Sequence, residues 1–153
     1  MPIVFKTPEE KYIRSYWETL GEICAEGKYL ALSEPFPYDV TLGFMKKIID
    51  EKIPAVFVID TENDRCIGWC DAVSADGKTG KLGMGILRPY REKGIGTKLL
   101  EAVKDRCAKN GYERIELKVW KSNIRAIHLY EKTGFVKTDE DKDTFTMSLD
   151  LKN

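Results

Sequence analysis

Apolar positions at helical spacing mark the first third of the chain. After a short strand pattern at 3–6, a stripe with a period of three to four residues predicts a helix: Tyr12, Tyr16 or Trp17, Leu20, and Ile23 or Cys24. Pro8 suits its first turn, and Thr7 is the expected N-cap. A loop over 29–38 precedes a second expected helix at 40–51, whose inner stripe is Leu42, Met45 and Ile49.

The pattern then changes to runs that predict strands. Apolar runs at 55–59, 66–74 and 81–88 are separated by turn signals at 62–64 and 76–78. Short turns between successive strands are typical of hairpins. The sequence therefore predicts a three-stranded antiparallel meander.

Helices and strands alternate in the rest of the chain. We expect a helix at 94–110, a strand at 115–120, a helix at 124–132, and a final hairpin of strands at 135–137 and 144–151. The order is β-α-α-β-β-β-α-β-α-β-β. It predicts a single α/β (α+β) domain over 1–153, with a mixed, mostly antiparallel central sheet flanked by helices.

Composition and charge argue against several classes of protein. The 153 residues carry 25 basic and 25 acidic side chains, so the zero net charge does not favour nucleic acid or an anionic membrane as a partner. No apolar run is long enough to span a bilayer, and the N-terminus lacks a signal-peptide pattern. We therefore expect a cytoplasmic protein.

Cysteine usage points away from a metal site. The four cysteines, at 24, 66, 70 and 107, lack paired C-x-x-C spacing, and the only histidine, His128, is distant in sequence. We expect no metal, and small buried thiols in a reducing compartment. Cys66 and Cys70 share parity, which predicts that both face the same side of their strand.

A glycine-rich stretch follows the third strand of the meander and opens the next helix: Arg91-Glu92-Lys93-Gly94-Ile95-Gly96-Thr97. Its two glycines permit backbone angles and a close approach that a side chain would forbid, and a helix N-terminus adds partial positive charge. The stretch predicts a site for a phosphate or pyrophosphate. From this motif alone, an ordinary glycine-rich loop is the open alternative.

A second motif lies downstream, with Asn123, Ala126, Leu129-Tyr130 and Gly134-Phe135 in a spaced order. Together with the first motif, it resembles the GCN5-related N-acetyltransferase (GNAT) superfamily. The resemblance is specific over 82–135 and extends to the element order of the whole chain. It implies an N-acetyltransferase that moves the acetyl group of acetyl-CoA to a primary amine of a small molecule or a protein.

The resemblance also implies which residues hold acetyl-CoA. The loop would bind the pyrophosphate: Arg91, Glu92, Lys93, Gly94, Ile95, Gly96 and Thr97. Strand residues Met84, Gly85 and Ile86 would lie beside the pantetheine arm, and Asn123 would contact that arm. The Ile86 N–H is the candidate to stabilise the thioester oxyanion, and Tyr130 would protonate the departing thiolate unless it only packs.

The general base is less well marked. The attacking amine must first lose a proton, and a lysine-like amine has a pKa near ~10. Many members carry a carboxylate on the strand before the pyrophosphate loop, but that strand has no acid here. Asp71 on the adjacent strand is the leading candidate, against the simpler interpretation of a solvated strand carboxylate. Glu34 is the alternative. His128 is a weaker candidate for the base, because it lies about 200° around its helix from Tyr130, and a surface histidine is the simpler interpretation.

The first helices, the loop between them and the last hairpin are expected to build the acceptor site. Tyr29, Glu34, Phe36 and Tyr38 would line it, because an acid among aromatic rings suits a cationic amine. The same rings could instead close the edge of the core. The acidic run 139–143 is most simply a solvated turn. Many relatives are dimers, so the resemblance also allows a homodimer; the alternating last strand could serve its interface or could equally be a core strand.

Two other functions stay open at the level of sequence. A non-catalytic acyl-CoA-binding regulatory module would keep the loop and lose the chemistry; the missing strand carboxylate favours it, and Tyr130 argues against it. A relaxed phosphate-loop pattern, from Ala72 through Gly77-Lys78-Thr79, would suit a nucleotide hydrolase. A strand-like run follows it instead of a helix, so we expect a hairpin turn there.

Overall fold

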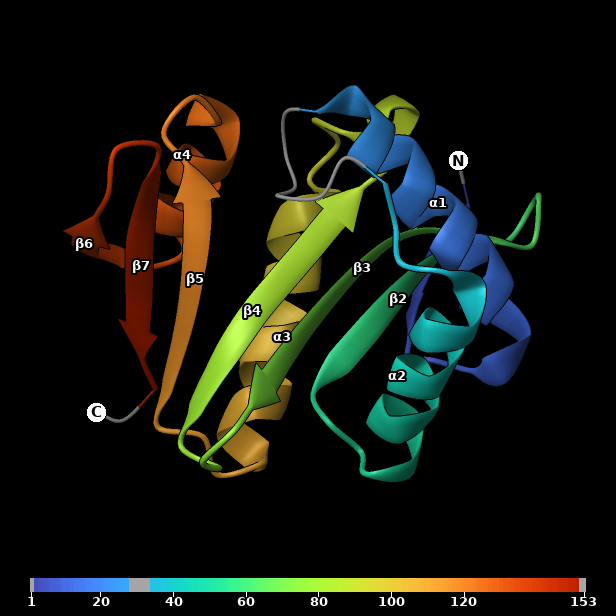
Figure 1. Ribbon diagram of the computed structural model, residues 1–153, viewed down its shortest axis with the longest axis horizontal. Coiled ribbons are helices and arrows are strands. Elements are labelled where there is room, and N and C mark those ends of the chain that lie inside the picture. Colours follow the sequence, from blue (N-terminus) through green and yellow to red (C-terminus); the bar gives the residue numbers. More distant parts are fainter. Residues whose placement is uncertain (1, 28–33, 152–153) are drawn as a thin grey trace.

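The computed structural model describes residues 2–27 and 34–151, and Figure 1 shows one twisted sheet with helices on both faces. The strands are β1 (Ile3–Lys6), β2 (Ala55–Asp60), β3 (Arg65–Ser74), β4 (Thr79–Ile86), β5 (Arg114–Trp120), β6 (Val136–Glu140) and β7 (Thr144–Asp150). The helices are α1 (Ile13–Glu26), α2 (Tyr38–Asp50), α3 (Ile95–Lys109) and α4 (Ile124–Lys132), with 3-10 turns at Glu10–Tyr12 and Arg88–Tyr90. The expected element order is confirmed.

The sheet has the strand order β1-β2-β3-β4-β5-β7-β6. Among the described strands, β4 and β5 are the parallel pair and the other neighbours are antiparallel, which confirms the meander and the mostly antiparallel sheet. The last strand, β7, lies between β5 and β6. Its alternation therefore reflects a strand inside the sheet, and β6 forms the edge.

Two hydrophobic clusters cover the two faces of the sheet. One joins α1 and α2 to β2 and β3 through side chains such as Tyr16, Met45 and Trp69. The other packs α3 and α4 on β3, β4, β5 and β7. In Figure 1, α1 and α2 lie in front of the sheet and α3 behind it. None of the helices in residues 2–27 and 34–151 is long and apolar enough to cross a membrane.

Both N-terminal helices begin elsewhere than the sequence predicts. The first helical turn is the 3-10 turn that starts after Glu9, so Thr7 as N-cap was wrong. The second helix begins at Tyr38, directly after Pro37, because proline's fixed φ sets the entry to the helix. Its fully buried positions are Thr41, Met45 and Ile48, while the expected Leu42 and Ile49 are only half-buried.

A bulge in β3 overturns the expected placement of two cysteines. Val58 pairs with Gly68 and Ile59 pairs with Cys66, so Ile67 is an extra residue on β3. The extra residue reverses the alternation of faces along the strand. Cys66 consequently packs under α1 and α2, whereas Cys70 packs under α3. The prediction that both face one side was wrong, although all four cysteines are buried and free.

The parallel pair β4–β5 is short. Only Thr79–Lys81 of β4 pairs with 114–116 of β5, although both strands run on well beyond that point. The two strands then separate in a V, which Figure 1 shows as the gap between the upper ends of β4 and β5. Among the described strands, the C-terminal half of β4 therefore has no partner on this edge.

Candidate active site

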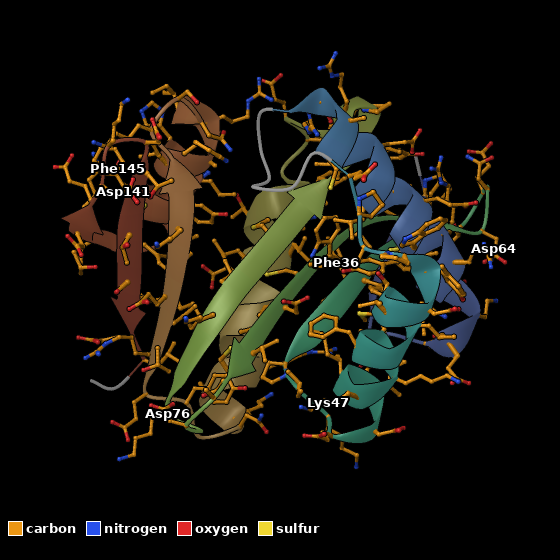
Figure 2. All side chains as sticks on the ribbon, viewed as in Figure 1. Phe36, Lys47, Asp64, Asp76, Asp141 and Phe145 are labelled. Atoms are coloured by element: carbon orange, nitrogen blue, oxygen red, sulfur yellow. The ribbon has the colours of Figure 1, made fainter. Side chains whose placement is uncertain are left out.

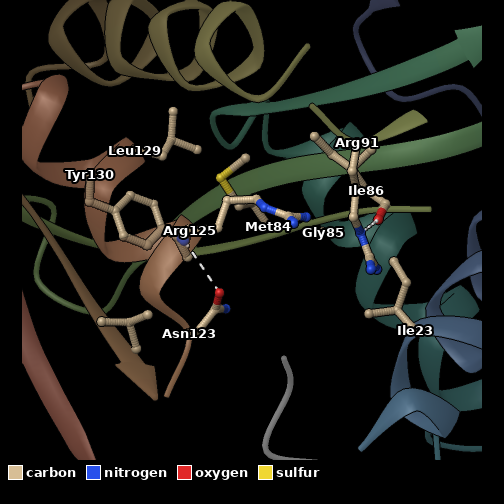
Figure 3. A pocket seen from close by; sticks show the side chains of 11 residues that line it. Ile23, Met84, Gly85, Ile86, Arg91, Asn123, Arg125, Leu129 and Tyr130 are labelled. Atoms are coloured by element: carbon tan, nitrogen blue, oxygen red, sulfur yellow. Dashed lines mark hydrogen bonds between the residues drawn. The ribbon is translucent and has the colours of Figure 1, made fainter. Parts of the chain in front are cut away.

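A cleft occupies the opening between β4 and β5. A cavity of about 140 Å³ is lined by Met84, Gly85 and Ile86 of β4, Val119 of β5, Asn123, Ala126, Leu129 and Tyr130 at α4, and Ile23 of α1. Figure 3 shows Tyr130, Leu129 and Asn123 on one side of it and Ile86, Arg91 and Ile23 on the other. The structure thus brings residues from both sequence motifs to one place.

The glycine-rich loop offers a row of free backbone donors. Within the described chain, none of the N–H groups of residues 92–97 donates a hydrogen bond. The backbone of Glu92 has φ 61° and that of Gly94 has φ 78°, a left-handed conformation that turns the chain into α3. Unpaired N–H groups at a helix N-terminus are the donor set that suits a pyrophosphate.

Gly96 is the point where this loop meets the cleft. A Cβ at this position would lie 3.2 Å from Cδ2 of Leu129 and 3.6 Å from Cδ1 of Ile86, so it would fill the space between α3, α4 and β4. A second surface depression runs over the loop and shares Ile86, Arg91, Arg125 and Leu129 with the cleft. Loop and cleft therefore form one continuous surface.

Asn123 is held at the start of α4. Its Oδ1 accepts the N–H of Ala126 at 3.3 Å, which is the bond of an N-cap residue. The cap uses the oxygen of the amide and leaves its NH2 group beside the cleft (Figure 3). Asn123 can therefore fix α4 and donate to a ligand at the same time.

Tyr130 lines the cleft from α4. The side chain is only 8% exposed, its ring packs 5.7 Å from that of Phe135, and its hydroxyl bonds to no described residue. Burial, and next the neighbouring Cys70, raises the pKa of the Tyr130 hydroxyl. The hydroxyl stays protonated at neutral pH, which is the state required of a proton donor.

Asp71 stands on the face of the sheet that α1 and α2 cover. It pairs with Gly83 of β4, and a Cβ on Gly83 would lie 3.5 Å from the Asp71 Oδ1. The residue is 9% exposed, and burial raises the pKa of its carboxyl group to about 7. A carboxyl group with this pKa can take up and release a proton near neutral pH.

Comparison with protein families identifies this arrangement. Residues 17–135 match the model of the Acetyltransferase (GNAT) family. The chain belongs to the GNAT family. The match runs from within α1 to Phe135, directly before β6, and so includes the loop and most of the residues that line the cleft. The resemblance seen in the two motifs is thereby confirmed.

Similar proteins carry related names. The chain is 49% identical over 53 residues to N-alpha-acetyltransferase 50 of Danio rerio, which is 34% of this chain and 32% of that protein. It is 48% identical over 58 residues to an N-alpha-acetyltransferase of Saccharolobus solfataricus, 37% of this chain and 34% of that protein. The chain thus spans about a third of the length of these curated relatives.

The fold is also that of solved GNAT structures. The phosphinothricin acetyltransferase of Sinorhizobium meliloti, solved in complex with acetyl-CoA, superposes with a TM-score of 0.86. The superposition covers 98% of this chain and 89% of that one, at 19% sequence identity. At this identity the likeness shows a shared fold.

The cleft-lining residues Ile23, Val119 and Arg125 were not predicted from the sequence. The role of Gly83, which pairs with Asp71 beside the cleft, was also missed; with Gly85 it forms a Gly-x-Gly pattern within a strand, a signal of close approach. A Cβ at Gly85 would lie 2.6 Å from the Trp69 ring and 3.2 Å from Ile23, so this glycine leaves room for both. Ile23 of α1 carries no local signal, since only folding brings it to β4.

The expected acceptor residues do not line the cleft as a group. Tyr29 lies outside the described residues, and Glu34 is exposed. Phe36 is 56% exposed and lies in front of the sheet on the α1–α2 face (Figure 2). The Tyr38 ring instead packs edge-on against Trp17, with the Arg14 guanidinium 4.1 Å above it. The role of Phe36 at an acceptor site stays a prediction.

The relaxed phosphate-loop pattern is a hairpin turn, as expected. Gly77 has φ 78°, and the Asp76 carboxylate accepts the N–H groups of Lys78 and Thr79 at 2.8 and 3.0 Å. These bonds lower the pKa of Asp76 to about 2. Strand β4 follows directly, and no group of three or more potential metal ligands occurs in the described parts of the chain.

Proposed function

We propose that the protein is an acetyl-CoA-dependent N-acetyltransferase. The observation that carries this proposal is the continuity between the free N–H groups of residues 92–97 and the apolar cleft beside β4. A pyrophosphate fits the first, and a slender pantetheine arm fits the second. Because Gly96 has no side chain, the space between it, Leu129 and Ile86 stays open for the ligand; a Cβ at this position would fill that space. The residues present therefore fit acetyl-CoA.

The backbone of Ile86 supplies the donor for the developing charge. Leu87 donates its N–H to Ile67 of β3 at 2.8 Å, so the preceding N–H, that of Ile86, faces the opposite edge and the cleft. Acetyl-CoA supplies an acetyl group activated as a thioester. A fixed N–H at the cleft edge would stabilise the oxyanion that forms during transfer.

Two side chains would act as general base and general acid. Asp71, whose pKa of about 7 follows from burial, would accept the proton of the attacking amine on the α1–α2 face. Tyr130, protonated because burial raises its pKa, would donate a proton to the departing thiolate. In this scheme Asp71 replaces the carboxylate that β4 lacks, and Gly83 leaves room for it.

The acceptor is a primary amine, and the α-amine of a polypeptide is the first class to test. Two relatives are named N-alpha-acetyltransferases, each matched over about a third of its length. The α1–α2 face, with Phe36 and Asp71, is where we place the amine. We also place the protein in the cytoplasm, since its four free, buried cysteines suit a reducing compartment. A homodimer stays a prediction, which light scattering can test by measuring the molar mass in solution.

Calorimetry and a thiol-release assay test the proposal. The purified protein should bind acetyl-CoA saturably and bind ATP–magnesium far more weakly. It should then release CoA when given one of three probes: spermidine, a hexapeptide with a free α-amine, or an α-blocked hexapeptide with one lysine. Absence of acetyl-CoA binding would remove the proposal. Binding without amine-dependent CoA release would favour the alternative of a regulatory acyl-CoA-binding module.

A further inference from the structure

Arg91, the first residue of the glycine-rich motif, makes contacts that are unexpected for a phosphate ligand. Its Nε donates to the carbonyl oxygen of Ile86 at 2.8 Å. Its Nη1 and Nη2 donate to the two carboxylate oxygens of Glu26, at 2.9 and 2.7 Å. Figure 3 shows the Arg91 side chain folded back toward Ile86. One guanidinium thus joins the end of β4 to the last residue of α1.

The pair is well shielded from solvent. The Arg91 and Glu26 side chains are 14% and 15% exposed. Hydrogen bonding from Arg91 is the main cause that keeps the pKa of Glu26 below its ordinary value; it outweighs burial, which acts in the opposite direction, and Arg88 adds to it. A bidentate arginine–carboxylate pair at such a site has a defined geometry. Because Glu26 balances its charge, Arg91 acts here through position more than through net positive charge.

The Ile86 carbonyl, which Arg91 contacts, lies beyond the part of β4 that pairs with β5. Beyond Lys81, β4 does not pair with β5, so within residues 2–27 and 34–151 the cleft-side peptide groups near Ile86 have no neighbouring strand. The Ile86 carbonyl and the Ile86 N–H face this same edge, and Arg91 takes the place of the missing neighbour. Lysine could not do so, because one ammonium group cannot reproduce the planar set of three donors.

We propose that Arg91 is a positioning residue for acetyl transfer. Held by Glu26, it fixes the backbone of Ile86 and so aims the Ile86 N–H at the thioester oxygen. The proposal rests on the proposed function and differs from the expectation that Arg91 serves the pyrophosphate. A positioning residue affects the rate of the chemical step, whereas a phosphate ligand affects affinity for CoA.

The test compares Arg91→Lys and Glu26→Gln with the matched control Arg88→Ala. Arg88 also contacts Glu26, at 3.1 Å, but it is 68% exposed and makes no hydrogen bond to Ile86. For each variant, kcat is measured with the acceptor from the amine screen, and the Kd of CoA by calorimetry. Circular dichroism and thermal unfolding check the fold.

We expect Arg91→Lys to lower kcat about 10- to 100-fold while the Kd of CoA changes less than about 3-fold. Glu26→Gln should lower kcat less, and Arg88→Ala should match the wild type in both. An unchanged kcat in folded Arg91→Lys, or a loss of CoA affinity as large as the loss of rate, would overturn the inference. So would failure of Arg91→Lys to fold, which would assign the pair to stability. Failure of the proposed function differs, because the wild type itself would then release no CoA.

Discussion

Asp71 illustrates how surroundings change the chemistry of a single residue. The sequence marks it as one acid on a strand, and nothing local distinguishes it from a solvated carboxylate. Burial on the α1–α2 face raises its pKa to about 7, because a low-dielectric environment disfavours the charged form. Burial likewise raises the pKa of the Tyr130 hydroxyl. The proposed base and acid thus derive their protonation states from packing.

Asp71→Asn should lower kcat/KM about 100-fold and remove the rise in rate as pH increases through about 7. Stability should change in the opposite sense. The native pKa lies above that of the unfolded chain, so the wild type loses stability as pH rises from about 4 to about 7. The Asp71→Asn variant should lack this loss, which urea titrations at several pH values can measure. Asp76→Asn, in the distant hairpin turn, is the control; an unchanged pH–rate profile in Asp71→Asn would exclude the base.

Tyr130→Phe should lower kcat about 100-fold, because it removes the proton donor for the thiolate. Stability should hardly change, since the hydroxyl bonds to no described residue. Steady-state kinetics with thermal unfolding check this. Tyr112→Phe is the matched control: its hydroxyl donates to the Ala72 carbonyl at 3.1 Å, so that variant should lose stability and keep kcat. Full activity in Tyr130→Phe would reduce Tyr130 to a packing residue.

At the scale of elements, the entry into α3 is the decisive structure. A left-handed residue at Gly94 starts the helix, Ile95 turns into the core, and Gly96 keeps the loop open toward α4. The backbone of one short loop thereby provides the donors, and the neighbouring helix provides the wall. Such a site depends on close approach, which makes it sensitive to added side-chain volume.

Gly96→Val should weaken binding of acetyl-CoA at least 10-fold, because the side chain would meet Leu129 and occupy the space kept open for the ligand; we expect a loss of about 1.4 kcal/mol or more. Calorimetry measures it. Gly43→Val is the control, since a Cβ at this glycine of α2 meets nothing within 4 Å and lies outside the cleft. Equal affinity in the wild type and Gly96→Val would contradict the role assigned to the loop.

At the scale of the whole molecule, the cleft lies at the weakest seam of the sheet. The strands on either side of it are joined by only three residue pairs between β4 and β5. A ligand in the V would contact β4, α3 and α4 together and so join the two parts. Binding should therefore stabilise the molecule globally.

CoA at about 100 times its Kd should raise Tm by about 5–10 °C, which corresponds to about 2.7 kcal/mol of linked stabilisation. Differential scanning fluorimetry measures the shift. ATP–magnesium should give none, and Gly96→Val should lose most of the CoA-dependent shift. A shift of equal size with ATP–magnesium would point to a nucleotide site instead.

The sequence by itself determined the element order, the two motifs, the family and the loop that offers its N–H groups. These are local signals: the hydrophobic period marks each helix or strand, and glycines mark the turns. Even so, helix starts near Thr7 and Tyr38 were misplaced, because the first turns depend on packing and on the backbone before them.

Only the tertiary structure decided where distant side chains meet. The bulge at Ile67 sends Cys66 and Cys70 to opposite faces, although their spacing predicts one face. Three further features depend on segments that lie far apart in the chain. They are the V between β4 and β5, the burial that raises the pKa of Asp71, and the contact of Arg91 with Glu26. Burial and long-range pairing follow from the folded arrangement as a whole, so no local pattern records them.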